Sequence, residues 1–287
     1  MRLIAFLLTL LLTLPAAAET VRLGDRWYDI QLPRNPKGAP LVLALHGGGG
    51  DPDQFASASG FGTAATRAGY AVAFPAGSGR RGERLLTWNG GYCCGYAQRQ
   101  GVDDIGFLKS VIKDARDRFG LSDRIFLTGM SNGSIMSETF AAKNPDLVRG
   151  VAGVAGTMDT GSTRVAGPVP ALIIHGTADT MVPYEGGQGD TSLTRTNFAS
   201  VASVVSAFLA PWGDGLSETS RKINRKDDGT SVIVTNYAKG DRLVLRLMTV
   251  EGGAHHWPGG RKARLKDGKT QEIDANTEIL RFFDLYK

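Results

Sequence analysis

Cysteine is nearly absent from this sequence, because its 287 residues include only Cys93 and Cys94, which are adjacent. Two neighbouring cysteines cannot close a long loop, so the fold must be held by its core. Cα atoms across a trans peptide lie about 3.8 Å apart, below the usual disulfide range of roughly 4.4 to 6.8 Å. The sequence therefore does not distinguish a strained disulfide between Cys93 and Cys94 from two free thiols.

Long apolar runs are also absent, except at the start of the chain, which reads MRLIAFLLTLLLTLPAAAET. Arg2 precedes this run and an A-x-A pattern ends it at Ala18. The run is too short to cross a bilayer comfortably, which argues against an uncleaved membrane anchor. We predict a signal peptide at residues 1–18, no membrane association, and a secreted or periplasmic mature protein at residues 19–287.

The chain has no strong charge of either sign. Its net charge is +5, with 33 basic and 28 acidic residues, and cleavage after Ala18 would remove only Arg2 from this balance. Basic residues are scattered, with small clusters only at residues 221–226 and 261–266. The pattern indicates solvated faces and gives no support to nucleic-acid binding.

Hydrophobic residues make up 42% of the sequence, enough for a large core. Five continuous apolar runs of strand length suit strands that are buried on both faces. They lie at residues 40–45, 70–74, 124–128, 148–154 and 171–174. An alternating strand at 26–32 precedes them, and strands at 231–236 and 243–250 flank a turn.

Helical patterns lie between these strands. The clearest covers residues 102–120, with acids Asp103 and Asp104 at its start and Gly120 at its end, and another closes the chain at 274–286. We interpret the two acids as cap and dipole partners of the helix. Alternation of strands and helices predicts one α/β domain, with a mostly parallel central sheet and helices on both faces.

A nucleophile motif lies at residues 125–133, IFLTGMSNG, between a predicted strand and a predicted helix. The pattern G-x-S-x-G in this context predicts a sharp turn that exposes the Ser131 hydroxyl. Serine needs a nearby base to act as a nucleophile. In such folds the partners follow in the order serine, acid, histidine, which restricts the base to His255 or His256. Asp179, just after a predicted strand, is the preferred acid, with Asp190 second.

The run LHGGGG at residues 45–50 offers backbone amides that could approach a developing oxyanion. We expect Gly48 to supply one donor and the amide of Asn132, next to the serine, to supply the other. A phosphate-binding loop is the rival interpretation, but the Lys-Ser/Thr pair of a P-loop is missing. Metal binding by the adjacent histidines is disfavoured, since no H-E-x-x-H or Cys/His ligand spacing accompanies them.

Read together, these motifs resemble an esterase family of polyhydroxybutyrate depolymerases, feruloyl esterases and acetyl xylan esterases. The resemblance runs from about residue 25 to the C-terminus, and it rests on LHGGGG, WNGGYCCG before VDDIGFL, GMSNG, IIHGTAD-x-x-VPY and GGAHHWPGG. The family's last motif, G-G-G-H-x-W-P-G, places His255 at the catalytic position and His256 at the variable one.

The resemblance implies an α/β-hydrolase fold and a secreted serine esterase without metal or cofactor, acting on feruloyl-type aryl esters or short polyhydroxybutyrate-type polyesters. Ser131, Asp179 and His255 would form its triad. Ester substrates of plant cell-wall or polyester origin and a monomeric state are expected. Acetyl xylan esterase or peptidase activity, or a hydrolase fold that only binds a ligand, are the alternatives.

Aromatic residues near the motifs suggest a cleft for the acyl group. Trp88, Tyr184 and Trp257 are candidate substrate-binding residues, and we expect His256 to line the same pocket. Ordinary core packing is the alternative for each aromatic side chain, because aromatics bury large areas wherever they occur.

Overall fold

The computed structural model describes four stretches of the chain, residues 18–80, 82–192, 194–260 and 269–287. The predicted signal peptide, apart from its last residue, and the basic cluster at 261–266 lie outside the described residues. Within those stretches, no helix combines the length and the apolar composition that a membrane span needs.

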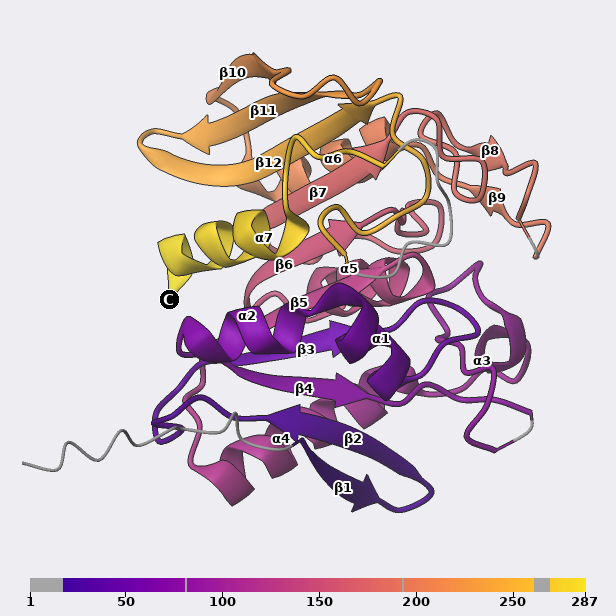
Figure 1. The fold of residues 1–287 in the computed structure, drawn as a ribbon, viewed down its shortest axis with the longest axis vertical. Helices are drawn as coiled ribbons and strands as arrows, with labels where there is room; N and C mark the ends of the chain where they lie inside the picture. Colours follow the sequence, from indigo (N-terminus) through magenta and orange to yellow (C-terminus); the bar gives the residue numbers. More distant parts are fainter. Residues whose placement is uncertain (1–17, 81, 193, 261–268) are drawn as a thin grey trace, which may run out of the picture.

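A ten-stranded sheet runs through the molecule, and its centre is parallel (Figure 1). In spatial order the central strands are β4 (Ala71–Pro75), β3 (Leu41–Leu45), β5 (Ile125–Met130), β6 (Val148–Val154), β7 (Ala171–Gly176) and β12 (Arg242–Glu251). Antiparallel strands flank them, β2 (Arg26–Gln31) and β1 (Glu19–Leu23) beside β4, and β11 (Ser231–Lys239) and β10 (Leu216–Ile223) beside β12.

The central strands form where the sequence carries apolar runs, because both faces of the sheet are covered. Along β3, Leu41, Leu43 and Leu45 belong to one buried cluster, whereas Val42 and Ala44 belong to the other. This division follows from the alternation of side chains along a strand. The prediction of doubly buried strands at the centre of the sheet is confirmed.

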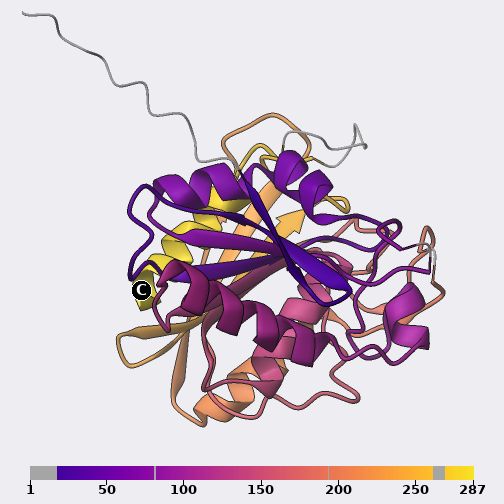
Figure 2. The same cartoon turned by 90° about the horizontal axis from the view of Figure 1, so that it is seen from below.

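Helices cover both faces (Figure 2). One face carries α4 (Asp104–Phe119), α5 (Asn132–Lys143) and α6 (Val201–Leu209), and the other carries α1 (Pro52–Ser59), α2 (Phe61–Arg67) and α7 (Ala275–Phe283). Short elements complete the chain, α3 (Gly95–Arg99), β8 (Gly187–Gln188), β9 (Asn197–Phe198), η1 (Ala210–Trp212) and η2 (Asp284–Tyr286). The architecture is the α/β class that the sequence predicts.

Helix α4 begins and ends close to where its sequence signals predict. The Asp103 carboxylate accepts a hydrogen bond from the Gly106 amide, which caps the helix N-terminus. At the other end Gly120 adopts a left-handed conformation with φ of 64°, a backbone state that favours glycine. The inward face of the helix buries Leu108 and Ile112 against the sheet.

Asp104 lies in the first turn of the helix, where the sequence predicts an acid that complements the helix dipole, and it also has a second role. Its side chain is buried and pairs with the Arg26 guanidinium at 2.8 Å, while its second oxygen accepts the Asn89 amide at 2.7 Å. The guanidinium also lies 3.6 Å from the centroid of the Phe107 ring. Asp104 therefore ties strand β2 to the loop at 88–95, a long-range role that a helix-start pattern does not reveal.

Candidate active site

Ser131 lies at a tight turn between strand β5 and helix α5. Its φ is 57°, in the left-handed region that a residue with a side chain rarely occupies, so the backbone here is strained. A Cβ on Gly129 would collide with the Gly133 backbone, and a Cβ on Gly133 would collide with the carbonyl oxygens of Leu45 and His46. Both glycines of the motif are therefore required by close packing of the backbone.

Asp179 and His255 are in direct contact although 76 residues separate them. Asp179 Oδ2 lies 2.7 Å from His255 Nδ1, and Asp179 Oδ1 accepts hydrogen bonds from the amides of Met181 and Val182 at 2.9 Å each. Burial would raise the pKa of Asp179, but the His255 hydrogen bond and nearby positive charge outweigh it, so the pKa lies below its usual value. The carboxylate is held ionised and aimed at the imidazole.

The three predicted triad residues lie at one edge of the sheet. Ser131 directly follows β5, Asp179 follows β7, and His255 follows β12. These strands are parallel members of the same sheet, and their carboxyl ends therefore meet at the same edge. The fold brings the acid and the histidine together there, at the same edge as the half-buried turn that carries the serine.

The glycine run at 47–50 packs against the start of helix α5. The Gly49 amide donates to the Leu86 carbonyl and the Gly50 amide donates to the Gly47 carbonyl, so both are occupied. Gly48 lines the cavity beside Ser131, and a Cβ added to it would lie 3.6 Å from Asn132 Cβ. Asn132 is the first residue of α5, where a backbone amide has no partner within the helix.

The Asn132 side chain fixes the loop that carries Trp88. Its carbonyl oxygen accepts the Trp88 amide at 2.7 Å, and its amide group donates to the Trp88 carbonyl at 3.0 Å. The Trp88 indole donates to the His46 carbonyl, and its side chain is fully buried. The prediction that Trp88 binds substrate is therefore wrong, because this indole is part of the support beneath the site.

The other predicted pocket residues also face the protein interior. Tyr184 donates or accepts a hydrogen bond with Thr249 and stacks edge-on against His175. His256 is buried, with Nδ1 2.9 Å from the Ala254 carbonyl and Nε2 accepting the Thr270 amide. Trp257 is buried against two phenylalanines, with its indole donating to Asn276. None of the three is among the residues that line the cavity of about 450 Å³ beside Ser131. A contact of Tyr184, His256 or Trp257 with substrate stays a prediction.

Of the two remaining histidines, His46 follows β3 and supports a loop, whereas His175 lies within β7. His46 Nε2 accepts the Gly77 amide and Nδ1 lies 2.8 Å from the Gly47 carbonyl, while burial lowers the pKa of His46 to about 4. His175 is likewise buried, with Nδ1 against the Gly176 carbonyl. Over the described residues, no three His, Cys, Asp or Glu side chains gather in a group that could hold a metal.

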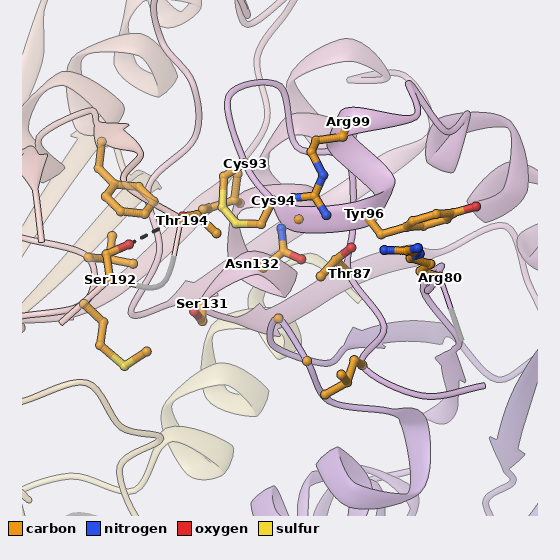
Figure 3. A pocket seen from close by; sticks show the side chains of 18 of the residues that line it. Arg80, Thr87, Cys93, Cys94, Tyr96, Arg99, Ser131, Asn132, Ser192 and Thr194 are labelled. Atoms are coloured by element: carbon orange, nitrogen blue, oxygen red, sulfur yellow. Dashed lines mark hydrogen bonds between the residues drawn. A yellow bond between two sulfur atoms is a disulfide. The ribbon is translucent and has the colours of Figure 1, made fainter. Parts of the chain in front are cut away.

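A cavity of about 450 Å³ opens beside Ser131, within the size range of small-molecule sites (Figure 3). Cys93 and Cys94 line it and are joined to each other by a disulfide. Of the two states that the sequence allowed for these cysteines, the structure has the vicinal disulfide, and this disulfide forms part of the cavity wall. Sequence reasoning missed this use of the cysteines, although their place within the WNGGYCCG motif was a signal.

Glu138 lies buried on helix α5 two turns beyond Ser131. Ser134 Oγ donates to its Oε1 at 3.3 Å, and a Cβ on Gly153 would collide with the same oxygen. Burial raises the pKa of this carboxyl from 4.5 to about 8. Glu138 is therefore protonated and neutral at neutral pH in the folded chain.

We expect Glu138→Gln to stabilise the protein at pH 8 and to do so much less at pH 5. Between the unfolded pKa of 4.5 and the folded pKa of about 8 the folded state holds a proton that the unfolded state has lost, so wild-type stability falls as pH rises. Glutamine removes this proton linkage, a gain of about 3 kcal/mol at pH 8. Thermal unfolding at both pH values measures it, with exposed Glu185→Gln as control. Parallel pH curves for wild type and Glu138→Gln would contradict the account.

Comparison with known proteins relates the chain to esterases. The model of the family described as "Esterase PHB depolymerase" matches residues 28–166. A protein named as an esterase, NocK of Nocardia uniformis subsp. tsuyamanensis, is 31% identical over 242 residues, covering 79% of this chain and 68% of NocK. Feruloyl esterase B of Piromyces equi is 32% identical over 157 residues, which cover 53% of this chain but only 28% of that protein.

Solved structures agree on the fold. The acetyl xylan esterase from Aspergillus awamori superposes with a TM-score of 0.60 at 15% identity, covering 94% of this chain and all of that one. The fold is thus the α/β-hydrolase fold, and the chain is a carboxylic ester hydrolase. It belongs to the esterase family of polyhydroxybutyrate depolymerases, feruloyl esterases and acetyl xylan esterases.

Proposed function

We propose that this esterase is a serine hydrolase that works through an acyl-enzyme, with Ser131 as nucleophile, His255 as base and Asp179 as the group that orients His255. The observation that carries the proposal is the contact of 2.7 Å between Asp179 Oδ2 and His255 Nδ1, at the sheet edge that also holds the strained turn of Ser131. These are the partners that a serine nucleophile requires.

In the first half-reaction, Ser131 Oγ attacks the ester carbonyl while His255 Nε2 takes the hydroxyl proton. The tetrahedral intermediate collapses, His255 returns the proton to the departing alkoxide, and the alcohol leaves. Water then attacks the acyl-enzyme with the same base, which releases the acid and restores Ser131. Asp179 stays ionised throughout, and it stabilises the imidazolium that forms in each half-reaction.

The amides of Asn132 and Gly48 are proposed to bind the oxyanion of both tetrahedral intermediates. Support comes from the place of Gly48 next to Asn132, where an added Cβ would lie 3.6 Å from Asn132 Cβ, and from the hydrogen bonds that already occupy the Gly49 and Gly50 amides. Because these backbone amides are already held in place by the fold, no free energy is needed to reorient them as the oxyanion forms. No metal or organic cofactor is needed for any step of this mechanism.

The proposed substrates are feruloyl-type aryl esters or short polyhydroxybutyrate-type oligomers, from plant cell wall or polyester, with acetylated polysaccharide next. A cavity of about 450 Å³ has room for an acyl group of this size. The named feruloyl and acetylxylan esterases among the relatives favour the same classes. We further propose that residues 19–287 form a single catalytic domain, exported after cleavage of residues 1–18 and active as a monomer.

Initial rates on three esters test the proposal. Mature wild-type protein would be given methyl ferulate, a soluble hydroxybutyrate trimer and an acetylated xylo-oligosaccharide side by side, with Ser131→Ala as the control for each. Turnover of at least one ester that is lost in the variant supports a serine esterase, and the preferred ester assigns the substrate class. Absence of turnover on all three would contradict the substrate assignment, and equal turnover in the variant would contradict the nucleophile.

A further inference from the structure

The cavity beside Ser131 has an apolar part and a cationic part. Apolar side chains from several segments line the first part, namely Cys93, Ile135, Met181, Val182 and Phe198. Arg80, Arg84 and Arg99 line the second, and no aspartate or glutamate is among the described residues that line the cavity. A substrate that fills this space therefore meets a local excess of positive charge.

None of these three guanidinium groups forms an ion pair within the described part of the chain. Glu83, the acid nearest to Arg84 in sequence, instead pairs with Arg22 on strand β1 at 2.9 Å. All three arginines are exposed, so each can turn toward a bound molecule. Unpaired arginines at a cavity wall leave their donor groups free for an anionic ligand.

The cationic side comes from two segments that the fold brings together. Arg80 and Arg84 lie in the loop that follows β4, and Arg99 is the last residue of helix α3. In Figure 3, Arg80 and Arg99 lie on the same side of the cavity as Tyr96, whereas Cys93 and Thr194 lie toward the opposite side, with Asn132 between the two groups. One substrate can thus place its apolar part and a charged group at different walls.

We propose that this esterase prefers esters that carry a free carboxylate, and that Arg99 and Arg80 bind that carboxylate while the reacting ester lies at Ser131. The proposal rests on the proposed function and narrows its substrate class. Short hydroxyalkanoate oligomers fit it, because each such chain ends in a carboxylic acid that is ionised at neutral pH. Guanidinium groups match the planar geometry of a carboxylate and can bind it through two parallel hydrogen bonds.

The test compares pairs of esters in which one member carries a carboxylate and the other carries an uncharged group at the same position. The first pair is para-nitrophenyl hemiglutarate and para-nitrophenyl pentanoate, which places the carboxylate on the acyl side. The second is the hydroxybutyrate trimer acid and its methyl ester, which places it on the alcohol side. We expect kcat/KM to be about tenfold higher for the anionic member of at least one pair, as for a charge-assisted hydrogen bond.

Arginine variants assign this preference to the cavity. In Arg99→Gln and Arg80→Gln, the ratio of kcat/KM for the anionic ester to kcat/KM for the neutral ester should fall about tenfold. Arg99→Lys should restore part of this ratio, because lysine keeps the positive charge but cannot form the two parallel hydrogen bonds of a guanidinium group. Arg34→Gln, an exposed arginine outside the cavity lining, is the matched control for net charge. Raising salt from about 20 to about 500 mM should reduce the wild-type preference.

The outcomes separate this proposal from the serine mechanism. Ser131-dependent turnover with no anionic preference in either pair, or with a preference that Arg99→Gln and Arg80→Gln leave intact, overturns carboxylate recognition and leaves the esterase mechanism standing. If no ester is turned over, calorimetric binding of both pairs to Ser131→Ala decides the matter. Tighter binding of the anionic ester that depends on Arg99 supports the proposal, and equal binding of both members overturns it.

Discussion

Ser131→Ala is expected to lower kcat/KM for ester hydrolysis by at least about 10⁴-fold, because alanine cannot form the acyl-enzyme. A small residual rate should remain, supplied by substrate binding and by the amides of Asn132 and Gly48. The strained backbone at position 131 accepts alanine no worse than serine, so the fold should survive. Initial rates together with thermal unfolding measure both effects.

Ser137→Ala is the matched control for this variant. Ser137 lies on helix α5, which begins directly after Ser131. It is fully buried, and its hydroxyl has no hydrogen-bond partner in the described part of the chain. Loss of its hydroxyl should change kcat/KM by less than about threefold, since Ser137 is not among the residues that line the cavity. Equal losses in the two variants would mean that the helix as a whole, rather than the Ser131 hydroxyl, governs activity.

Asp179→Asn is expected to reduce kcat by about 10⁴-fold with little change in KM, as for the corresponding change in other serine triads. The carboxylate accepts the Met181 and Val182 amides through Oδ1 and faces His255 Nδ1 through Oδ2. An asparagine can keep the first two bonds only by turning its NH₂ group toward His255. That arrangement selects the wrong imidazole tautomer and removes the charge that stabilises the imidazolium.

Asp190→Asn serves as the comparison, since Asp190 was the second choice of acid from the sequence. Asp190 is exposed and follows the short strand β8 rather than a strand of the central sheet. Its replacement should leave kcat within about twofold of wild type. Should Asp190→Asn be the variant that loses activity, the contact between Asp179 and His255 would have a structural role only.

The centre of the sheet could be predicted because its strands leave a strong signal. Leu41–Leu45 is apolar at every position since both faces of β3 are covered. Strand β10, Leu216–Ile223, escaped prediction for the opposite reason. It is an edge strand with exposed side chains along most of its length, so no alternation of apolar and polar residues marks it.

Helices α1 and α2 were also missed, although local signals for α1 exist. Asp51 caps α1 by accepting the Gln54 amide, and Pro52 occupies its first turn. Gly60, with φ of 65°, ends α1 and immediately precedes α2. Asp followed by Pro is a readable start signal, but both helices are short and polar enough to resemble a loop in the sequence.

The placement of Asp179 and His255 could be anticipated because each follows a readable strand. The pocket could not be anticipated in the same way. Trp88 and Trp257 were predicted to bind substrate because they lie within the motifs. In the structure both side chains are buried: the Trp88 indole donates to the His46 carbonyl, and Trp257 packs against Phe55. Sequence proximity to a motif does not tell whether a side chain points into a cavity or into the core.

The cationic wall of the cavity is likewise a product of tertiary structure. Arg80 and Arg99 are separated by 19 residues and lie in a loop and a short helix, respectively. In the sequence Arg80 has Arg81 and Arg84 close by, but nothing in that segment relates it to Arg99. The two arginines line the same cavity only because the fold brings their two segments together.

Covalent labelling of the wild-type protein with a fluorophosphonate tests the central claim most directly. Such a probe reacts only with a serine that a neighbouring base activates, so intact-mass measurement followed by peptide mapping reports both the activation and its position. The account predicts a single adduct on the peptide that contains Ser131, absent from Ser131→Ala and formed far more slowly in Asp179→Asn. No adduct on active wild-type protein, or an adduct at another residue, would contradict it.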